Sequence, residues 1–591
     1  MALKPAQTSL KSAAMTSRTF AIGAIAALLA SCTHAPAAPT APTGWIERSN
    51  AHAQLLLDVL AKFRPEGAAR NGMSGIDDQV TDFTPGHRER VRAAVRAATA
   101  ELQARAAREQ DPLVAQDLAI LVRAGQEDIE GSELNEKYQV QYLQPERFIF
   151  GSVHSLLDPQ VAKERWPAAL ARLQKYLGSP SLFELAQAET REGLKNPALA
   201  PPSRLDVENE LKTWKVTGEG IDKLFADYRI EGAAEPLARL HQQLAEREKF
   251  LREEVLPRAR ADFRLPPPVY AFALKKVGVD IPPEQLTAMA HQAFGEIQGE
   301  MQKVAAQVAK ARGLASADYR DVIRELKKEA IPDDQILAHY QGRLKDLEQI
   351  IRAHHLVTLP RRDARIRLGT PAENAQQPAP HMMPPRLIGN TGEQGEFVLP
   401  LSVPGAPEAR YDDFTYAAAS WTLTAHEARP GHELQFATLL ERGVSLARAQ
   451  FAFNSVNAEG WGLYSEAIAL PYMPPEGQLV SLQLRLQRAA RAFLDPELQQ
   501  GKWTHESARQ FLMKEVGLSP AFATSEVDRY TFRSPAQATA YFYGYTRLVE
   551  LRAEAERKLG AAFDAQKFHD LILAQGLLPP DLMRKAVLAA L

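Results

Sequence analysis

Apolar residues recur at intervals of three and four along most of the chain after about residue 45, which is the spacing of one face of an α-helix. The clearest set is Leu286, Met289, Ala293, Ile297, Met301, Val304 and Val308. Pro282 and Pro283 mark the start of this helix. A further helix is expected from Asp333, whose carboxylate favours a helix N-terminus, to about His354. We therefore predict a predominantly α-helical protein.

The helical pattern is interrupted near Leu356, because prolines are frequent from residue 359 to 407. Inside this stretch, residues 395–401 predict a short strand, and Pro400 either places it at a sheet edge or ends it. An exposed edge would bind an extended peptide by strand addition, with Phe397 as a candidate substrate-binding residue. An ordinary strand of a small sheet is the alternative. Helices resume after Tyr411, which divides the chain into regions 45–355 and 356–591.

The N-terminus is a targeting segment. An apolar run at residues 20–29 follows Lys11 and Arg18 and is too short to span a bilayer, so residues 1–31 are interpreted as a signal peptide. The run ends in Leu-Ala-Ser-Cys, which resembles the bacterial lipobox, and Cys32 is the single cysteine of the chain. We expect Cys32 to be the lipid attachment point; an ordinary cleaved signal is the alternative.

Residues 33–43 are rich in Ala, Pro and Thr, so residues 32–44 are predicted to be a lipidated cysteine with a flexible tether. Several acyl chains would hold the protein stably on a membrane. Thr33 after the cysteine indicates the periplasmic side of the outer membrane, by analogy with lipoprotein sorting.

Length and charge narrow the class of protein. The 591 residues suffice for one large body or several units. With 70 basic and 72 acidic residues, the net charge is -2, so the sequence lacks the basic excess of a nucleic-acid-binding protein. The oligomeric state is not predicted.

The segment from His426 to His432, His-Glu-Ala-Arg-Pro-Gly-His, places two imidazoles and a carboxylate within seven residues. On an ideal helix the two histidines would be rotated by about 240° and would diverge. Pro430 removes the amide that would bond back to His426, so we predict that the helix breaks here and resumes near His432. Gly431 would supply the unusual backbone dihedrals. Both rings can then face one zinc ion that keeps an open coordination position.

These segments resemble the domain-of-unknown-function 885 family, a group of bacterial proteins, many of them lipoproteins, that is placed with the gluzincin metallopeptidases. The resemblance rests on the histidine segment, on Asn-Ala-Glu-Gly-Trp-Gly-Leu-Tyr at residues 457–464, and on Pro-Ala-Gln-Ala with Tyr541 at residues 535–541. It covers about residues 45–585 and implies a bilobed, gluzincin-like fold with a small β-sheet near the active-site helix. Two departures are Ala536 for Gly and Gly462 for Ala, and neither is expected to touch a ligand.

By this resemblance, His426, His432 and Glu459 are the ligands of one zinc ion. Reasoning from the residues leaves Glu466 as a rival, because it lies about two helical turns after Glu459; it is either the third ligand or a partner that orients a ligand ring. Glu427 is the proposed general base, which takes a proton from the attacking water and passes it to the leaving amine.

A tyrosine or a histidine is expected to stabilise the oxyanion. Tyr541 is the first candidate, and Tyr530, Tyr543 and Tyr545 compete with it. Arg529 or Arg533 would pair with a substrate carboxylate.

The sequence therefore predicts a zinc-dependent hydrolase, a metallopeptidase that acts on peptides in the bacterial cell envelope, with its catalytic residues in region 356–591. Two alternatives stand beside it. One is an envelope lipoprotein that binds without catalysis. The other is a metal-dependent amide or ester hydrolase with a non-peptide substrate.

Overall fold

The structure is a computed structural model that describes residues 44–403 and 406–591. The signal segment, Cys32 and the tether predicted at residues 33–43 lie outside the described residues. Helices dominate, which confirms the predicted class. Region 45–355 contains these helices: α1 (Gly44–Phe63), α2 (Pro65–Arg70), α3 (His87–Ala106), α4 (Pro112–Tyr138), α5 (Pro145–His154), α6 (Pro167–Tyr176), α7 (Leu182–Gly193), α8 (Arg204–Asp227), α9 (Ala234–Phe250), α10 (Pro267–Val277), α11 (Pro283–Arg312), α12 (Tyr319–Lys327) and α13 (Asp333–Ala353).

The proline-rich stretch forms the short strands. They are β1 (Arg365–Leu368), β2 (His381–Met383), β3 (Glu396–Leu399), β4 (Ser402–Val403) and β5 (Ala406–Arg410), with α14 (Pro371–Gln376) among them. The helices that follow are α15 (Ala417–Glu427), α16 (His432–Arg442), α17 (Ser455–Ala469), α18 (Pro475–Gln499), α19 (His505–Phe511), α20 (Pro520–Asp528), α21 (Ala540–Leu559), α22 (Ala565–Ala574) and α23 (Pro580–Ala590).

The helix predicted after Pro282 is α11, and its apolar face is buried as expected. Leu286, Ile297, Met301 and Val308 belong to one hydrophobic core with residues of α18, and α11 packs along α18. This core joins residues on both sides of the boundary at 355, and Gly44–Leu591 is one compact unit. Regions 45–355 and 356–591 are therefore not separate domains.

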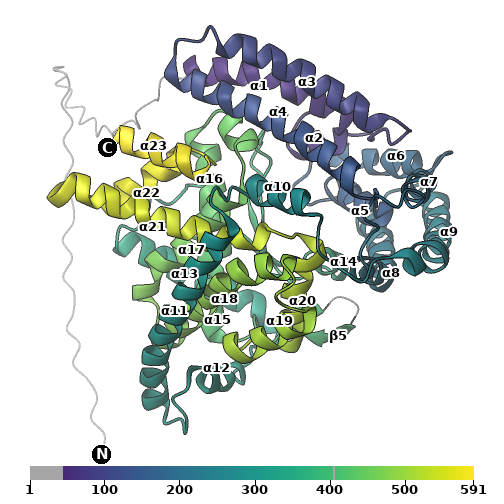
Figure 1. Cartoon of the computed structure of the whole chain (residues 1–591). Coiled ribbons are helices and arrows are strands. Elements are labelled where there is room, and N and C mark those ends of the chain that lie inside the picture. The colour runs from purple at the N-terminus through teal and green to yellow at the C-terminus, as the bar shows by residue number, and fades with distance from the viewer. Residues whose placement is uncertain (1–43, 404–405) are drawn as a thin grey trace, which may run out of the picture. The chain divides into compact units, whose positions relative to one another are not determined.

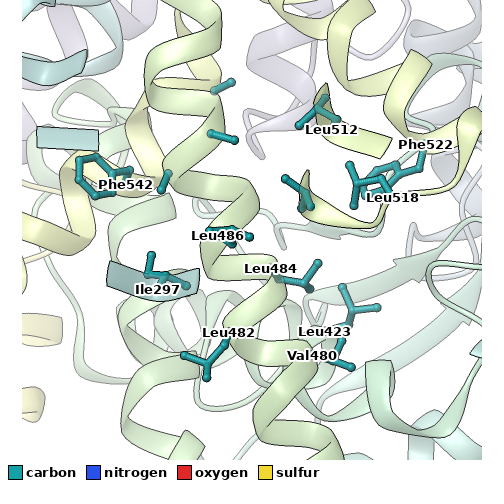
Figure 2. Close-up of a cluster of buried hydrophobic side chains, with 14 of the residues drawn as sticks. Ile297, Leu423, Val480, Leu482, Leu484, Leu486, Leu512, Leu518, Phe522 and Phe542 are labelled. Atoms are coloured by element: carbon teal, nitrogen blue, oxygen red, sulfur yellow. The ribbon is translucent and has the colours of Figure 1, made fainter. Parts of the chain in front are cut away.

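Helix α18 is the central element of this core. Every residue from Leu479 to Leu498 is buried except Arg485, which is half-buried. The helix packs against α11, α15 and α21, as Figure 1 shows. Its leucines Leu482, Leu484 and Leu486 point in different directions (Figure 2). They belong to the same hydrophobic core as Leu423 of α15. A helix that is buried on all sides is stable only when other helices surround it.

The strand predicted at residues 395–401 exists as β3, but it is not an edge. The sheet order is β1-β3-β2, so β3 pairs in parallel with β1 and antiparallel with β2. The strand ends at Leu399, before Pro400, because proline cannot donate the next ladder hydrogen bond. Phe397 is fully buried and packs against the ring of Tyr340. The exposed-edge prediction and the substrate-binding role of Phe397 are therefore wrong, and the alternative of an ordinary strand is correct.

Candidate metal centre

The two histidines of the motif flank the predicted break in the chain. Helix α15 ends at Glu427 and α16 begins at His432, so His426 lies at the end of one helix and His432 at the start of the next. Trp461 stabilises the non-helical linker between the two helices, because its indole N–H donates to the carbonyl oxygens of Pro430 and Gly431 at 3.1 and 3.3 Å. The linker therefore leaves the helical path, as Pro430 predicts.

Gly431 has the unusual backbone dihedrals that the sequence predicted, since its ψ of -132° at a φ of -79° is neither helical nor extended. A Cβ atom at this position would also lie 1.8 Å from the carbonyl oxygen of His426 and 2.5 Å from that of Ala425. Glycine is needed here because the chain folds back onto the end of α15, and only a residue without a side chain fits.

The two imidazoles and Glu459 converge on one point. Oε2 of Glu459 lies 3.5 Å from Nε2 of His426 and 3.3 Å from Nε2 of His432. One ligand atom from each of the three residues lies within 4.8 Å of the others. Two ligand atoms at ~2.0–2.2 Å from a tetrahedral zinc ion are themselves about 3.3–3.6 Å apart. The two separations measured from Glu459 therefore match edges of a zinc coordination tetrahedron.

The hydrogen bonding of the three residues also fits a cation. Oε2 of Glu459 is buried and has no hydrogen-bond partner among the described residues. Nδ1 of His426 lies 2.7 Å from Oε1 of Glu466, so its N–H donates there and Nε2 presents a lone pair toward Glu459. A buried carboxylate oxygen that faces two ring nitrogens requires a positive charge between them, either a metal ion or a proton on a ring. The donor set of two imidazole nitrogens and one carboxylate is typical of catalytic zinc.

Glu466 is the residue that orients a ligand ring. Its Oε1 accepts from His426, and its Oε2 accepts from the hydroxyl of Thr422 at 2.5 Å. Glu466 therefore lies on the far side of the imidazole from Glu459, and the ring is held between the two carboxylates of α17. This arrangement favours Glu459 as the third ligand.

A second orienting contact involves Gln537, whose amide donates to Oε1 of Glu459 at 3.1 Å. Gln537 in turn accepts a hydrogen bond from Arg529. Because Oε1 is occupied, Oε2 is the oxygen left for the metal. The sequence placed Gln537 in a family-like segment, but its role needed the structure.

The titratable groups of the site strongly shift one another's pKa values. Burial alone lowers the pKa of the His426 imidazole, but contacts with Glu459 and Glu466 outweigh burial and raise this pKa to about 9. Burial opposes ionisation of Glu459, but the two imidazoles outweigh it and hold the pKa of that carboxyl well below its ordinary value. Both shifts have the same cause, because the imidazoles and the carboxylates lie within ion-pair distance of one another.

Glu427 and Tyr541 line the same cavity of about 230 Å³ as His432 and Glu459. Burial raises the pKa of the Glu427 carboxyl. The ring of Tyr541 stacks on His426, with centroids 5.9 Å apart, and its hydroxyl accepts from Arg529 at 2.9 Å. The phenolic hydrogen of Tyr541 therefore remains available to a substrate.

The competing tyrosines lie elsewhere. Tyr530 donates to Glu526, Tyr543 donates to Asp280, and Tyr545 lies beside Arg485. None of the three lines the metal cavity. Tyr541 is thus the tyrosine that the fold brings to the candidate centre.

Helix α21 reaches the site because it lies very close to α17. A Cβ atom on Gly460 would be 2.6 Å from the backbone of Gly544, and one on Gly544 would be 2.0 Å from the carbonyl oxygen of Val456. This glycine-to-glycine contact allows the two helices to approach, and it brings Tyr541 beside Glu459.

The two departures from the family pattern have structural consequences. Gly462 lies against the ligand rings, since a Cβ there would be 2.6 Å from Cε1 of His426, so the expectation that it touches no ligand is wrong. Ala536 has a φ of +75°, a conformation that favours glycine. Its N–H donates to both carboxylate oxygens of Asp495, at 3.0 and 2.9 Å, which anchors the turn before Gln537.

Arg533 lines a neighbouring cavity of about 430 Å³, where it donates to Asn209 at 3.3 Å. This cavity shares Gln377, Ala379 and Arg529 with the metal cavity. It also shares Arg147 and Gln376 with a third cavity of about 810 Å³. The three cavities therefore adjoin one another through shared wall residues, and the first of them contains the candidate metal centre.

A family model described as bacterial protein of unknown function (DUF885) matches residues 65–587. The chain belongs to this family. The resemblance inferred from the motifs is thereby confirmed. The comparison with curated proteins finds no match.

Two solved structures share the fold. A protein from Colwellia psychrerythraea matches with a TM-score of 0.73 and 20% identity, over 92% of this chain and 99% of that chain. A protein from Shewanella oneidensis matches with a TM-score of 0.67 and 19% identity, over the same shares. Both are described as a "putative lipoprotein". A protein from Bacillus anthracis, described as a "putative oligoendopeptidase F", matches with a TM-score of 0.27 and 11% identity, which is too low to support an argument.

Proposed function

We propose that this DUF885 protein is a zinc-dependent hydrolase, a metallopeptidase that cleaves peptides in the bacterial cell envelope. The observation that carries the proposal is that Oε2 of Glu459 lies 3.5 and 3.3 Å from Nε2 of His426 and His432, while a second buried carboxylate, Glu427, lines the same cavity. A protein that only binds a metal has no physical need for a carboxylate next to a ligand.

A zinc ion held by these three residues would supply a polarised substrate carbonyl and an acidified water. Glu427 directly follows a ligand in the chain and faces the same cavity, so it is placed to take a proton from the attacking water and to pass it to the leaving amine. Tyr541 donates its phenolic hydrogen to the developing oxyanion, while Arg529 fixes the phenol from the other side.

The cavities support an extended substrate. Three adjoining cavities, each sharing wall residues with the next, suit an extended chain better than one small molecule. Strand β2 is the edge strand beside β3, and its residues His381 and Met382 line the metal cavity. Strand addition, which β3 does not permit, is therefore proposed for β2. The bilobed, gluzincin-like fold remains part of this proposal, on family resemblance.

Attachment to the envelope through Cys32 is also proposed, with the outer membrane as the site and its periplasmic side as the compartment. The lipobox-like segment supports it, as do the descriptions of the two structural relatives. In residues 44–403 and 406–591, no helix has the length and apolar character that a membrane crossing needs.

The test is the variant Glu427→Gln with metal analysis. We expect wild-type protein to hold one zinc ion per chain and to hydrolyse a peptide library, and Glu427→Gln to keep the zinc and lose turnover by on the order of 100-fold or more. Glu506→Gln is the matched control, because it alters a second His-Glu pair whose carboxylate contacts Arg509 far from the cavity. Wild-type protein that gains no zinc would favour the non-catalytic binding protein. Zinc-loaded protein that cleaves only non-peptide amides or esters would favour the other alternative.

A further inference from the structure

Helix α18 carries two buried arginines beside the candidate metal centre. Arg488 and Arg491 expose only 7% and 3% of their side chains, and both line the metal cavity. Burying a guanidinium in a hydrophobic core is costly unless a carboxylate pairs with it. The partner of each arginine therefore indicates what it is there to do.

Arg491 has a partner within the protein. Its Nε and Nη2 donate to the two oxygens of Glu526 at 2.6 and 2.7 Å, a bidentate ion pair. Tyr530 donates to the same carboxylate at 2.6 Å. The charge of Arg491 is thus compensated by the fold itself.

Arg488 has no such partner. Its Nη1 donates to the carbonyl oxygen of Leu484 at 3.3 Å and to Gln487 at 3.2 Å, and its buried Nε has no hydrogen-bond partner among the described residues. The carboxylate paired with it is Glu466, at 3.9 Å, whose oxygens already accept from His426 and Thr422. A buried, always charged group is therefore left with unused donors beside the metal ligands.

The position of Arg488 shows what its ligand must be. It lines the cavity with Glu427 and Tyr541, and its guanidinium carbon lies 5.6 Å from the Tyr541 ring centroid. Arg529, on the same wall, donates to Gln537 and Tyr541 and has no ion pair with a described carboxylate. Two guanidiniums that lack a close, bidentate carboxylate partner thus line the cavity that holds Glu427 and Tyr541. A planar guanidinium binds a carboxylate through paired hydrogen bonds.

We propose that Arg488 binds the free C-terminal carboxylate of the substrate peptide, so that the enzyme removes residues from the carboxyl end. This inference rests on the proposed peptidase function. The remainder of the peptide then runs past Gln377 and Ala379 into the adjoining cavities, since these residues are shared by the two spaces. Arg488 is a specificity-determining residue in this scheme, and Arg529 assists it.

The experiment uses one pool of short peptides of randomised sequence, made once with free C-terminal carboxylates and once with C-terminal amides. We expect zinc-loaded wild-type protein to cleave the free pool faster by on the order of 100-fold, the value of a charge-assisted pair in a desolvated site. Arg488→Gln should lose this preference, because cleavage of the free pool becomes slower, mainly through a higher KM, while cleavage of the amidated pool stays the same. Arg488→Lys should restore part of the preference. Arg485→Gln, on the same helix but outside the cavity, should keep the wild-type preference.

A binding measurement separates this inference from the proposed function. Zinc-loaded Glu427→Gln should retain more of the free pool than of the amidated pool in equilibrium dialysis, and adding Arg488→Gln should abolish the difference. Equal cleavage of both pools by wild-type protein overturns the inference but leaves the peptidase proposal intact. An equal loss on both pools in Arg488→Gln also overturns it, because Arg488 would then act on the reacting carbonyl. If cleavage depends on acidic side chains in the peptide instead of its C-terminus, the inference is likewise wrong.

Discussion

Glu466→Gln tests whether a carboxylate behind the imidazole strengthens the metal site. The substitution keeps the shape of the side chain. The amide oxygen still accepts from Nδ1 of His426, and the amide N–H can donate to the hydroxyl oxygen of Thr422. Only the negative charge behind the ring is lost, so a change in zinc affinity reports on that charge.

The magnitude follows from the hydrogen bond to His426. A hydrogen bond to a charged acceptor contributes ~1.5–3 kcal/mol and one to a neutral acceptor ~0.5–1.5 kcal/mol. The difference of about 1.0–1.5 kcal/mol corresponds to about a tenfold loss of zinc affinity. Glu466→Ala removes the bond altogether and should fall at the upper end of the 10–100-fold range known for partners of metal-bound histidines.

The assay is competition for zinc with a fluorescent chelator at neutral pH, together with thermal unfolding of the zinc-free protein. Glu433→Gln is the matched control. Glu433 is equally buried and follows the ligand His432 in the chain, but its carboxylate pairs with Arg429 at 2.6 Å. The control should keep wild-type zinc affinity. If Glu466→Gln binds zinc as tightly as the wild type, the reasoning about the charge is refuted.

Two further changes test other parts of the structure. Gly431→Ala should destabilise the protein by about 3 kcal/mol and abolish zinc binding, because the added carbon overlaps the carbonyl oxygen of His426. Gly295→Ala is the control: nothing lies within 4 Å of the added carbon, so this variant should unfold at or above the wild-type temperature. Burial disfavours the Glu526 carboxylate, but Arg491 outweighs burial and depresses the pKa from 4.5 to about 2, so this pair stabilises the fold above pH 4.5 and the stabilisation is lost as the pH falls toward 2. Urea unfolding across this range should show a shallower acid loss in Glu526→Gln, and an unchanged slope would contradict the assignment.

Much of the local structure was predictable, because it depends on spacing along the chain. The apolar spacing of residues 286–308 predicted α11, and Pro430 predicted the break between α15 and α16. The third ligand was harder. Glu459 and Glu466 are seven residues apart, about 10.5 Å along a helix, and the ring of His426 lies between them. Spacing alone therefore made both carboxylates plausible ligands.

Other predictions failed because they concerned contacts between distant segments. The pattern at residues 395–401 predicted a strand, but its pairing on both sides depended on β1 and β2, so Phe397 became core. Nothing in the sequence singled out Arg488, since arginines on helices are usually exposed. Its burial and its unused hydrogen-bond donors depend on the packing of other helices around α18.

The sequence by itself determined the helical class, the broken helix and the kinds of donor atom available to a metal, because each depends on residues close together in the chain. The tertiary structure decided which carboxylate lies between the two imidazoles, which one accepts from the far side of the His426 ring, and which buried arginine keeps unused hydrogen-bond donors. These outcomes depend on distances and burial, and both are set by the packing of α15, α17, α18 and α21 against one another.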